Sequence, residues 1–60
     1  MSTETRLAIR DVMAMRLRLM AQQQTNLAAA LTRPAQASLR THFLESATLM
    51  LDAAKELSHA

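Results

Sequence analysis

The stretch AALTRPAQASL, residues 29–39, contains the only proline of a 60-residue chain that has no glycine. A residue that precedes proline is pushed out of the helical region of backbone conformation, so a first helix should end at Thr32 or Arg33. Pro34 itself suits the first turn of a new helix, where its missing N–H group leaves no hydrogen bond unmade. The stretch therefore predicts a sharp turn between two helices.

The residues on both sides of this turn are mostly good helix formers, and their apolar members recur at helical spacing. We expect one domain over residues 1–60, with a helix at about 3–31, a turn at about 32–33 and a second helix at about 34–57. A connection this short makes the two helices antiparallel neighbours. The predicted fold is therefore all-α, an antiparallel two-helix hairpin.

The chain is too short to be stabilised by a large core. A protein of 60 residues buries only about three-fifths of the surface that its unfolded chain exposes. Proteins of this size are usually supported by disulfides, a metal ion or a partner, but the sequence has no cysteine and no cluster of histidines with carboxylates. We therefore expect a partner chain to complete the hairpin.

The same sequence predicts where the protein works. The absence of cysteine suits a reducing cytosol. The first residues lack the basic start and apolar run of a signal peptide, and no apolar stretch approaches the roughly 18 residues that cross a membrane. We expect a cytoplasmic protein without membrane contact.

One apolar stripe on each helix should form the contact between them. The small alanines in the second stripe should lie opposite the methionines of the first, as alternating sizes do in a packed seam. Gln24 interrupts the first stripe, either at its edge or as a polar device that fixes the register. The predicted hairpin core consists of Ile9, Met13, Leu17, Met20, Leu27 and Leu31 with Leu39, Phe43, Ala47, Met50, Ala54 and Leu57.

Other apolar residues have no cover within a two-helix unit. They form a second stripe on the first half of the first helix, and two leucines beside the main stripe of the second helix. A contiguous exposed apolar patch marks an interaction surface. The partner-binding residues that this pattern predicts are Val12, Met15, Leu19, Leu44 and Leu51.

This surface serves either a different helical protein or a second copy of the chain in a four-helix bundle. A foreign partner is favoured because the second stripe covers only half of one helix, whereas a homodimeric bundle needs both helices apolar along their length. The methionines point the same way, since flexible thioether side chains adapt to a partner's surface. We therefore predict a protein-binding module.

The sequence shows no catalytic arrangement. His42 falls on the side of the second helix away from the main stripe, and His59 lies near the chain end, so neither is expected to act as a metal ligand or general base. The carboxylates of the second helix, Glu45, Asp52 and Glu56, line no common pocket in this pattern. We expect no enzyme activity, no catalytic residue, no cofactor and no metal site.

Nucleic acid is the other partner class that the composition raises, because four of the seven basic residues lie in the first helix. Arg16 falls between the two apolar stripes, and Arg10 and Arg18 lie roughly 80° apart on the helix wheel, so they form no continuous strip for a phosphate backbone. The alternative function is nevertheless a homodimeric four-helix-bundle regulator that binds RNA or DNA, as the plasmid regulator Rop does.

Several short motifs, in their order along the chain, resemble those of a known family. They are ETRL at residues 4–7, LRL at 17–19, AL at 30–31, Pro34 with Gln36, and LDAAKEL at 51–57. On these landmarks the chain resembles the small E-type co-chaperones of type III secretion needle subunits, the YscE and PscE group, over nearly its whole length.

The resemblance implies a function and two partners. Members of the family are helical hairpins that pair in the bacterial cytosol with a helical-repeat chaperone, and the pair holds the needle subunit unpolymerised before export. The E-type protein stabilises that chaperone through surface near its first helix. The resemblance therefore adds Leu7 to Val12, Met15 and Leu19 as expected contacts, and it makes the helical-repeat chaperone and the needle subunit the expected partners.

Overall fold

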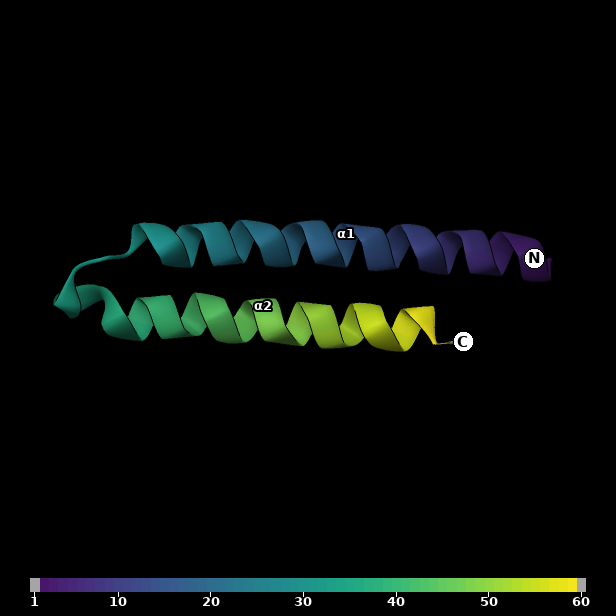
Figure 1. Cartoon of the computed structure of the whole chain (residues 1–60). Coiled ribbons are helices and arrows are strands. Elements are labelled where there is room, and N and C mark those ends of the chain that lie inside the picture. The colour runs from purple at the N-terminus through teal and green to yellow at the C-terminus, as the bar shows by residue number, and fades with distance from the viewer. Residues whose placement is uncertain (1, 60) are drawn as a thin grey trace.

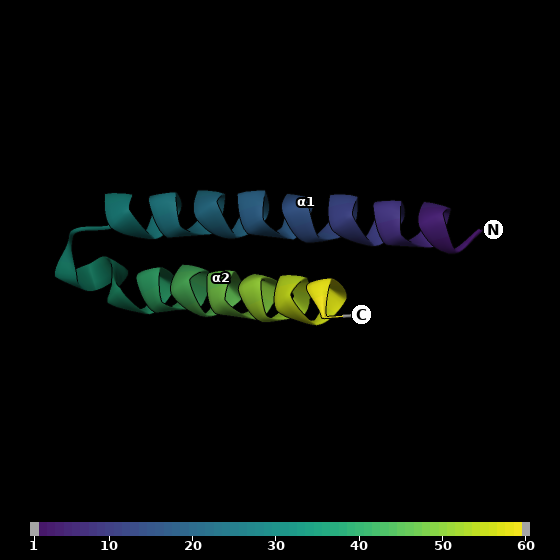
Figure 2. The same cartoon turned by 45° about the vertical axis from the view of Figure 1, so that its right-hand side comes forward.

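The computed structural model describes residues 2–59 and is an antiparallel pair of α-helices (Figure 1). Helix α1 is Thr3–Ala30 and helix α2 is Ala37–Ser58. Helix α2 starts three residues later than expected, because residues 34–36 form a 3-10 turn, and it ends one residue later than expected. The molecule is a rod of 50 × 14 × 13 Å, and two views show the helices side by side along the whole of α2 (Figures 1 and 2). The predicted all-α hairpin is confirmed.

Helix α1 begins where Ser2 supplies a cap. Ser2 has an extended backbone with φ −70° and ψ 159°, and its hydroxyl oxygen accepts a hydrogen bond from the N–H of Thr5 at 3.2 Å. This bond satisfies one of the first N–H groups, which have no partner inside the helix. Glu4 places negative charge at the positive end of the helix dipole. These local interactions explain why the helix starts at Thr3.

The chain leaves the first helix just before Pro34, as the sequence predicts, but the details of the turn differ. Helix α1 ends at Ala30, one residue early, because Leu31 leaves the helical region with φ −91° and ψ 80°. A 3-10 turn, η1 (Pro34–Gln36), then leads directly into α2. The side-chain oxygen of Gln36 accepts the Arg33 N–H at 3.3 Å, and the Gln36 N–H donates to the Arg33 carbonyl at 2.9 Å. No residue from 2 to 59 has a positive φ, so this reversal requires no glycine.

The contact between the helices is a narrow seam built on alanine. The buried residues of the described chain are all alanines, and they recur every seven positions: Ala14, Ala21 and Ala28 on α1, with Ala47 and Ala54 on α2. Three positions after each of them comes a half-buried residue that completes the seam: Leu17 and Gln24 on α1, Leu31 just after its end, and Met50 and Leu57 on α2. A seven-residue repeat is typical of two helices packed along one seam. Side chains as small as alanine let the two helices approach closely.

Helix α1 is turned about its axis relative to the prediction. Leu17 and Leu31 are half-buried in the seam, and so are Phe43, Met50 and Leu57, beside the buried alanines of α2. The prediction of a core position was wrong for five residues, which are exposed by 42% to 48%: Ile9, Met13, Met20, Leu27 and Leu39. The error came from placing the largest apolar side chains inward. A seam between only two helices is narrow, and α1 fills it with alanine instead.

Gln24 lies in the seam, in the same row as Leu17 and Leu31, and it is half-buried. No buried side-chain nitrogen or oxygen among the described residues lacks a hydrogen-bond partner. The Gln24 amide therefore keeps contact with water at the border of the seam. A polar residue at this position carries little desolvation cost.

Candidate protein-binding surfaces

Because α1 buries its alanines, its larger apolar side chains lie beside the seam or on the outer surface of the helix. Twelve large apolar side chains of the described chain are exposed by at least 42%. Most of them fall on three surfaces that differ in composition and in the helices that build them.

The first surface, which we call the methionine face, lies on one side of the seam. Most of its members come one residue before a buried alanine, and antiparallel packing puts such positions of both helices on the same side of the seam. The α1 row carries only large side chains, whereas small residues occupy two of the three positions on α2. The methionine face consists of Met13, Met20 and Leu27 on α1, Leu39, Ser46 and Ala53 on α2, and Ile9 at its end.

The second surface, the Arg18 side, lies on the opposite side of the seam and is more polar. Arg18 Nη2 donates a hydrogen bond to Ser58 Oγ at 2.8 Å, which is the one side-chain hydrogen bond between the helices in residues 2–59. Here a polar row on α1 faces a row on α2 that is mainly leucine. The Arg18 side consists of Asp11, Arg18 and Thr25 on α1, with Leu44, Leu51 and Ser58 on α2.

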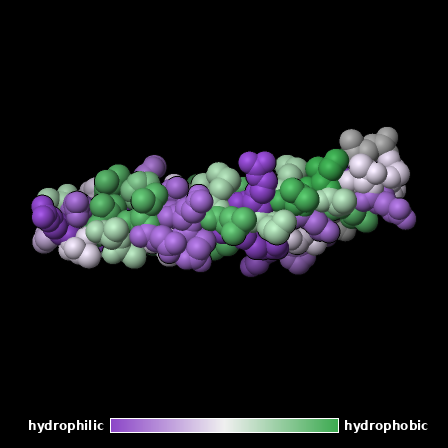
Figure 3. All heavy atoms as spheres, turned by 90° about the horizontal axis from the view of Figure 1, so that it is seen from above, coloured by the Kyte–Doolittle hydropathy of each residue, from purple (hydrophilic) through white to green (hydrophobic). Residues whose placement is uncertain are grey.

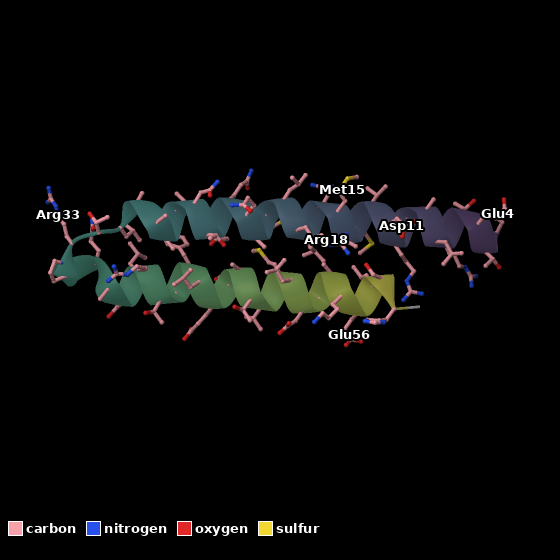
Figure 4. The ribbon with its side chains drawn as sticks, viewed as in Figure 1. Glu4, Asp11, Met15, Arg18, Arg33 and Glu56 are labelled. Carbon is pink, nitrogen blue, oxygen red and sulfur yellow. The ribbon has the colours of Figure 1, made fainter. Side chains whose placement is uncertain are left out.

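The third surface, the outer stripe, consists of Val12, Met15 and Leu19 on the part of α1 that faces away from α2. Met15 extends outward from α1 (Figure 4), and Leu19 is 60% exposed. Viewed from the side of α1, hydrophobic and hydrophilic residues alternate along the rod (Figure 3). The outer surface of α1 therefore lacks the continuous polar face expected of a helical hairpin that is stable without a partner.

A shallow groove joins the outer stripe to the methionine face near the N-terminal end of α1. Its volume is about 300 Å³, and Ile9, Val12 and Met13 form much of its lining, with Thr5, Ala8 and Arg16. Residues three and four positions apart on a helix are neighbours on its surface, so the groove follows directly from the sequence spacing. The apolar surface of α1 is therefore broadest over its first half.

The structure divides the predicted partner-binding residues instead of gathering them. Val12, Met15 and Leu19 share the outer stripe, but Leu44 and Leu51 lie on the Arg18 side, beyond the polar row of α1. All five are exposed, as is Leu7. The stripe and the two leucines of α2 are therefore separate surfaces, and the two sets need not contact the same partner.

Leu7 has a different setting, because it continues the alanine row of the seam beyond α2. It precedes Ala14 by seven residues, yet it is 47% exposed. In Figure 4, α1 continues from Asp11 to Glu4 past the end of α2, and Leu7 belongs to this segment. The seam thus presents an uncovered apolar residue where α2 stops.

Three of the four arginines of α1 lie on different sides of the helix. Arg10 is half-buried in the seam, Arg18 binds Ser58 on one side, and Arg16 borders the groove near Met13 on the other. A phosphate backbone binds best to a continuous basic strip. These arginines offer no such strip within the described residues.

Residues 2–59 contain no group of three or more His, Cys, Asp or Glu side chains that could hold a metal ion. His42 is exposed, and its ring lies 5.7 Å from that of Phe43, centroid to centroid, at a tilt of 59°. Neither α1 nor α2 is long and apolar enough to cross a membrane.

The accessible surface shows how open the hairpin is. A compact monomeric protein of 6.7 kDa is expected to expose about 3,900 Å², whereas this chain exposes 4713 Å². It therefore buries about half of the surface of the unfolded chain, against the three-fifths or so typical of this size. The exposed residues include twelve large hydrophobic ones.

Comparisons of the chain with models of known protein families, with curated proteins and with solved structures find no significant match. The three surfaces are therefore interpreted from their own geometry and chemistry.

Sequence reasoning missed the methionine face because it assigned those residues to the core. The signal that could have found it is the alanine repeat, with Ala14, Ala21 and Ala28 spaced by seven residues. Alanine at every seventh position, with Leu17 and Leu31 three positions on, matches a two-helix seam better than a stripe of methionines does. Once the alanines face inward, the residues just before them must flank the seam.

Proposed function

We propose that this chain is a non-enzymatic protein-binding module that docks on another helical protein. The observation that carries the proposal is the division of its apolar residues: five alanines are buried among residues 2–59, and twelve large hydrophobic side chains are exposed. Apolar surface of this extent on a small rod is stabilised when another protein covers it.

The outer stripe is the surface that we assign to the foreign partner. It lies on a single helix, faces away from α2 and places Val12, Met15 and Leu19 at positions three or four residues apart. Such a row fits the groove between two helices of a partner, as an amphipathic helix does in helix-in-groove recognition. Met15 and its flexible thioether adapt to the shape of that groove.

The specific form of the proposal follows from the resemblance to E-type secretion co-chaperones. The partner would be a cytoplasmic helical-repeat chaperone, and the complex would hold a needle subunit unpolymerised. Capture of the monomeric subunit opposes its assembly by mass action. The exposed Leu7 and the outer stripe would contribute to the contact with the chaperone.

The test is native mass spectrometry of the tagged chain, purified with nuclease treatment from the cells that naturally make it. A stoichiometric complex with a helical-repeat chaperone and a needle subunit is the expected result. A chain that carries no other protein, or one that held RNA before the nuclease was added, would contradict the proposal and favour the homodimeric nucleic-acid regulator.

Site-directed variants locate the contact. Leu19→Ser should abolish the complex while leaving the far-ultraviolet circular dichroism of the chain unchanged, because Leu19 is 60% exposed and lies outside the seam. The matched control is Leu49→Ser, since Leu49 is 70% exposed on α2 and belongs to none of the three surfaces. Equal loss of binding in both variants would show that the outer stripe is not the docking surface.

A further inference from the structure

We infer that a second copy of this chain covers the methionine face, giving a four-helix dimer in which α1 of each copy packs against α2 of the other. This inference goes beyond the proposed function, because it concerns self-association through a different surface from the outer stripe. Three features support it: the surplus of exposed surface on the chain, the distribution of side-chain size on the face and the charges at the border of the face.

The area matches what a stable dimer needs. The chain exposes 4713 Å², about 800 Å² more than a compact protein of its mass. A specific interface of standard size removes about 800 Å² from each partner. A dimer interface of that size would therefore bring the chain to the exposure expected of a compact protein.

The sizes of the side chains favour one arrangement of the two copies. Met13, Met20 and Leu27 form a row of large side chains on α1, whereas Ser46 and Ala53 leave the α2 row low. If α1 of one copy lies over α2 of the other, the large row of α1 meets a row in which Ser46 and Ala53 are small and only Leu39 is large, so large and small residues mostly alternate, as in well-packed cores. If α1 of one copy instead lies over α1 of the other, their large residues oppose each other. The two α2 helices then face each other, and their small residues leave voids. Two-fold symmetry then repeats the favourable contact twice.

The charges agree with the same arrangement. Helix α1 carries four arginines against two acidic residues, and α2 carries three acidic residues against two basic ones. Arg16 borders the face on α1, three residues after Met13, and Glu56 borders it on α2, three residues after Ala53. Glu56 extends from α2 on the side away from α1 of its own chain (Figure 4). Opposite charges at matching borders favour this pairing of helices over the alternative.

The first experiment is sedimentation equilibrium of the purified full chain at about 10 μM. Interfaces of standard size have dissociation constants of about 1 μM or lower, so the dimer should predominate at this concentration. We expect a dimer of twice 6.7 kDa. Met20→Lys should raise the dissociation constant by about a hundredfold or more, because it buries a charge without a partner in the interface. The control is Met15→Lys, which places the same charge on the same helix outside the face and should leave the dimer intact.

A charge exchange keeps the test decisive if Met20→Lys also disturbs folding. Arg16→Glu should weaken the dimer by about tenfold through repulsion from Glu56 of the second copy, and adding Glu56→Arg should restore it. Both residues are exposed, so the helix content measured by circular dichroism should not change. Failure of the second substitution to restore the dimer would overturn the proposed arrangement.

Three other results would overturn the inference: a monomeric wild-type chain at this concentration, equal effects of the two lysine substitutions, or binding of a foreign helical protein that depends on Met20 while the free chain is monomeric. These outcomes are separate from the proposed function. Loss of the foreign partner in Leu19→Ser tests the outer stripe alone, because that substitution should leave the dimer unchanged.

Discussion

The two sides of the seam are made from the same pair of helices, yet they divide large and polar side chains in opposite ways. On the methionine face, α1 supplies large apolar residues, and α2 supplies mainly small ones. On the Arg18 side, α1 supplies a polar row that bonds across to Ser58, and α2 supplies exposed Leu44 and Leu51. The comparison shows that a helix pair with one narrow seam can carry two flanks of different chemistry, one mainly apolar and one crossed by a solvent-exposed polar contact.

The largest expected effect comes from breaking the seam that both flanks depend on. Ala21 is 2% exposed in the middle of the seam, and Ala21→Leu would force the helices apart. Overpacking a tight contact costs about 1–3 kcal/mol, and we expect the upper end of that range. Urea denaturation at a fixed chain concentration measures the change. Ala29→Leu, at an exposed position of the same helix, should leave the midpoint almost unchanged.

A second variant separates the seam from the Arg18 side. Phe43→Ala removes a half-buried aromatic from the seam and should lower the free energy of unfolding by about 2 kcal/mol, less than the 3–5 kcal/mol of a fully buried phenylalanine. Leu44→Ala, one residue further along, removes a side chain that is 45% exposed and should cost clearly less. Thermal denaturation of the two variants gives the difference. A larger loss of stability at Leu44 than at Phe43 would mean that α2 packs against α1 through its Leu44 side, contrary to the structure.

A third variant sharpens the role of small residues on the methionine face. Ser46→Leu puts a large side chain into the α2 row of the methionine face, where Ser46 and Ala53 are small. In the inferred dimer, large side chains of the second copy pack against this row. The clash should weaken the dimer by about tenfold, in line with an overpacking cost near 1.5 kcal/mol. Sedimentation measures the dissociation constant. Thr48→Leu, on the exposed outer surface of α2, serves as the control, and an equal effect there would speak against the face.

The smallest expected effect concerns the polar contact of the Arg18 side. Arg18→Gln removes the 2.8 Å hydrogen bond to Ser58, which is exposed to solvent. Exposed charged contacts contribute little, so we expect a loss of about 0.5 kcal/mol or less in the free energy of unfolding. A double-mutant cycle with Ser58→Ala isolates the pair. A coupling energy above about 1 kcal/mol would mean that this side is less hydrated than its exposure suggests.

Local chemistry made the hairpin predictable. Pro34 marked the turn because its ring excludes the helical conformation for the residue before it, a constraint that acts within a few residues. Phe43 and Met50 were placed correctly near the seam because α2 has one clear apolar stripe. The site was less predictable: the sequence identified Val12, Met15 and Leu19 as exposed apolar residues, but it assigned Met13 and Met20 to the core.

The sequence by itself determined two helices, the position of the turn and a surplus of apolar residues, since each depends on backbone preference and composition. Only the tertiary structure decided which stripe of α1 faces α2. The choice depends on the distance at which two helices pack, and Ala14, Ala21 and Ala28 permit a closer approach than methionine does. That rotation of α1 moved Met13, Met20 and Leu27 from the expected core to an exposed face. The orientation of a helix is a property of the pair, which the periodicity of one helix cannot specify.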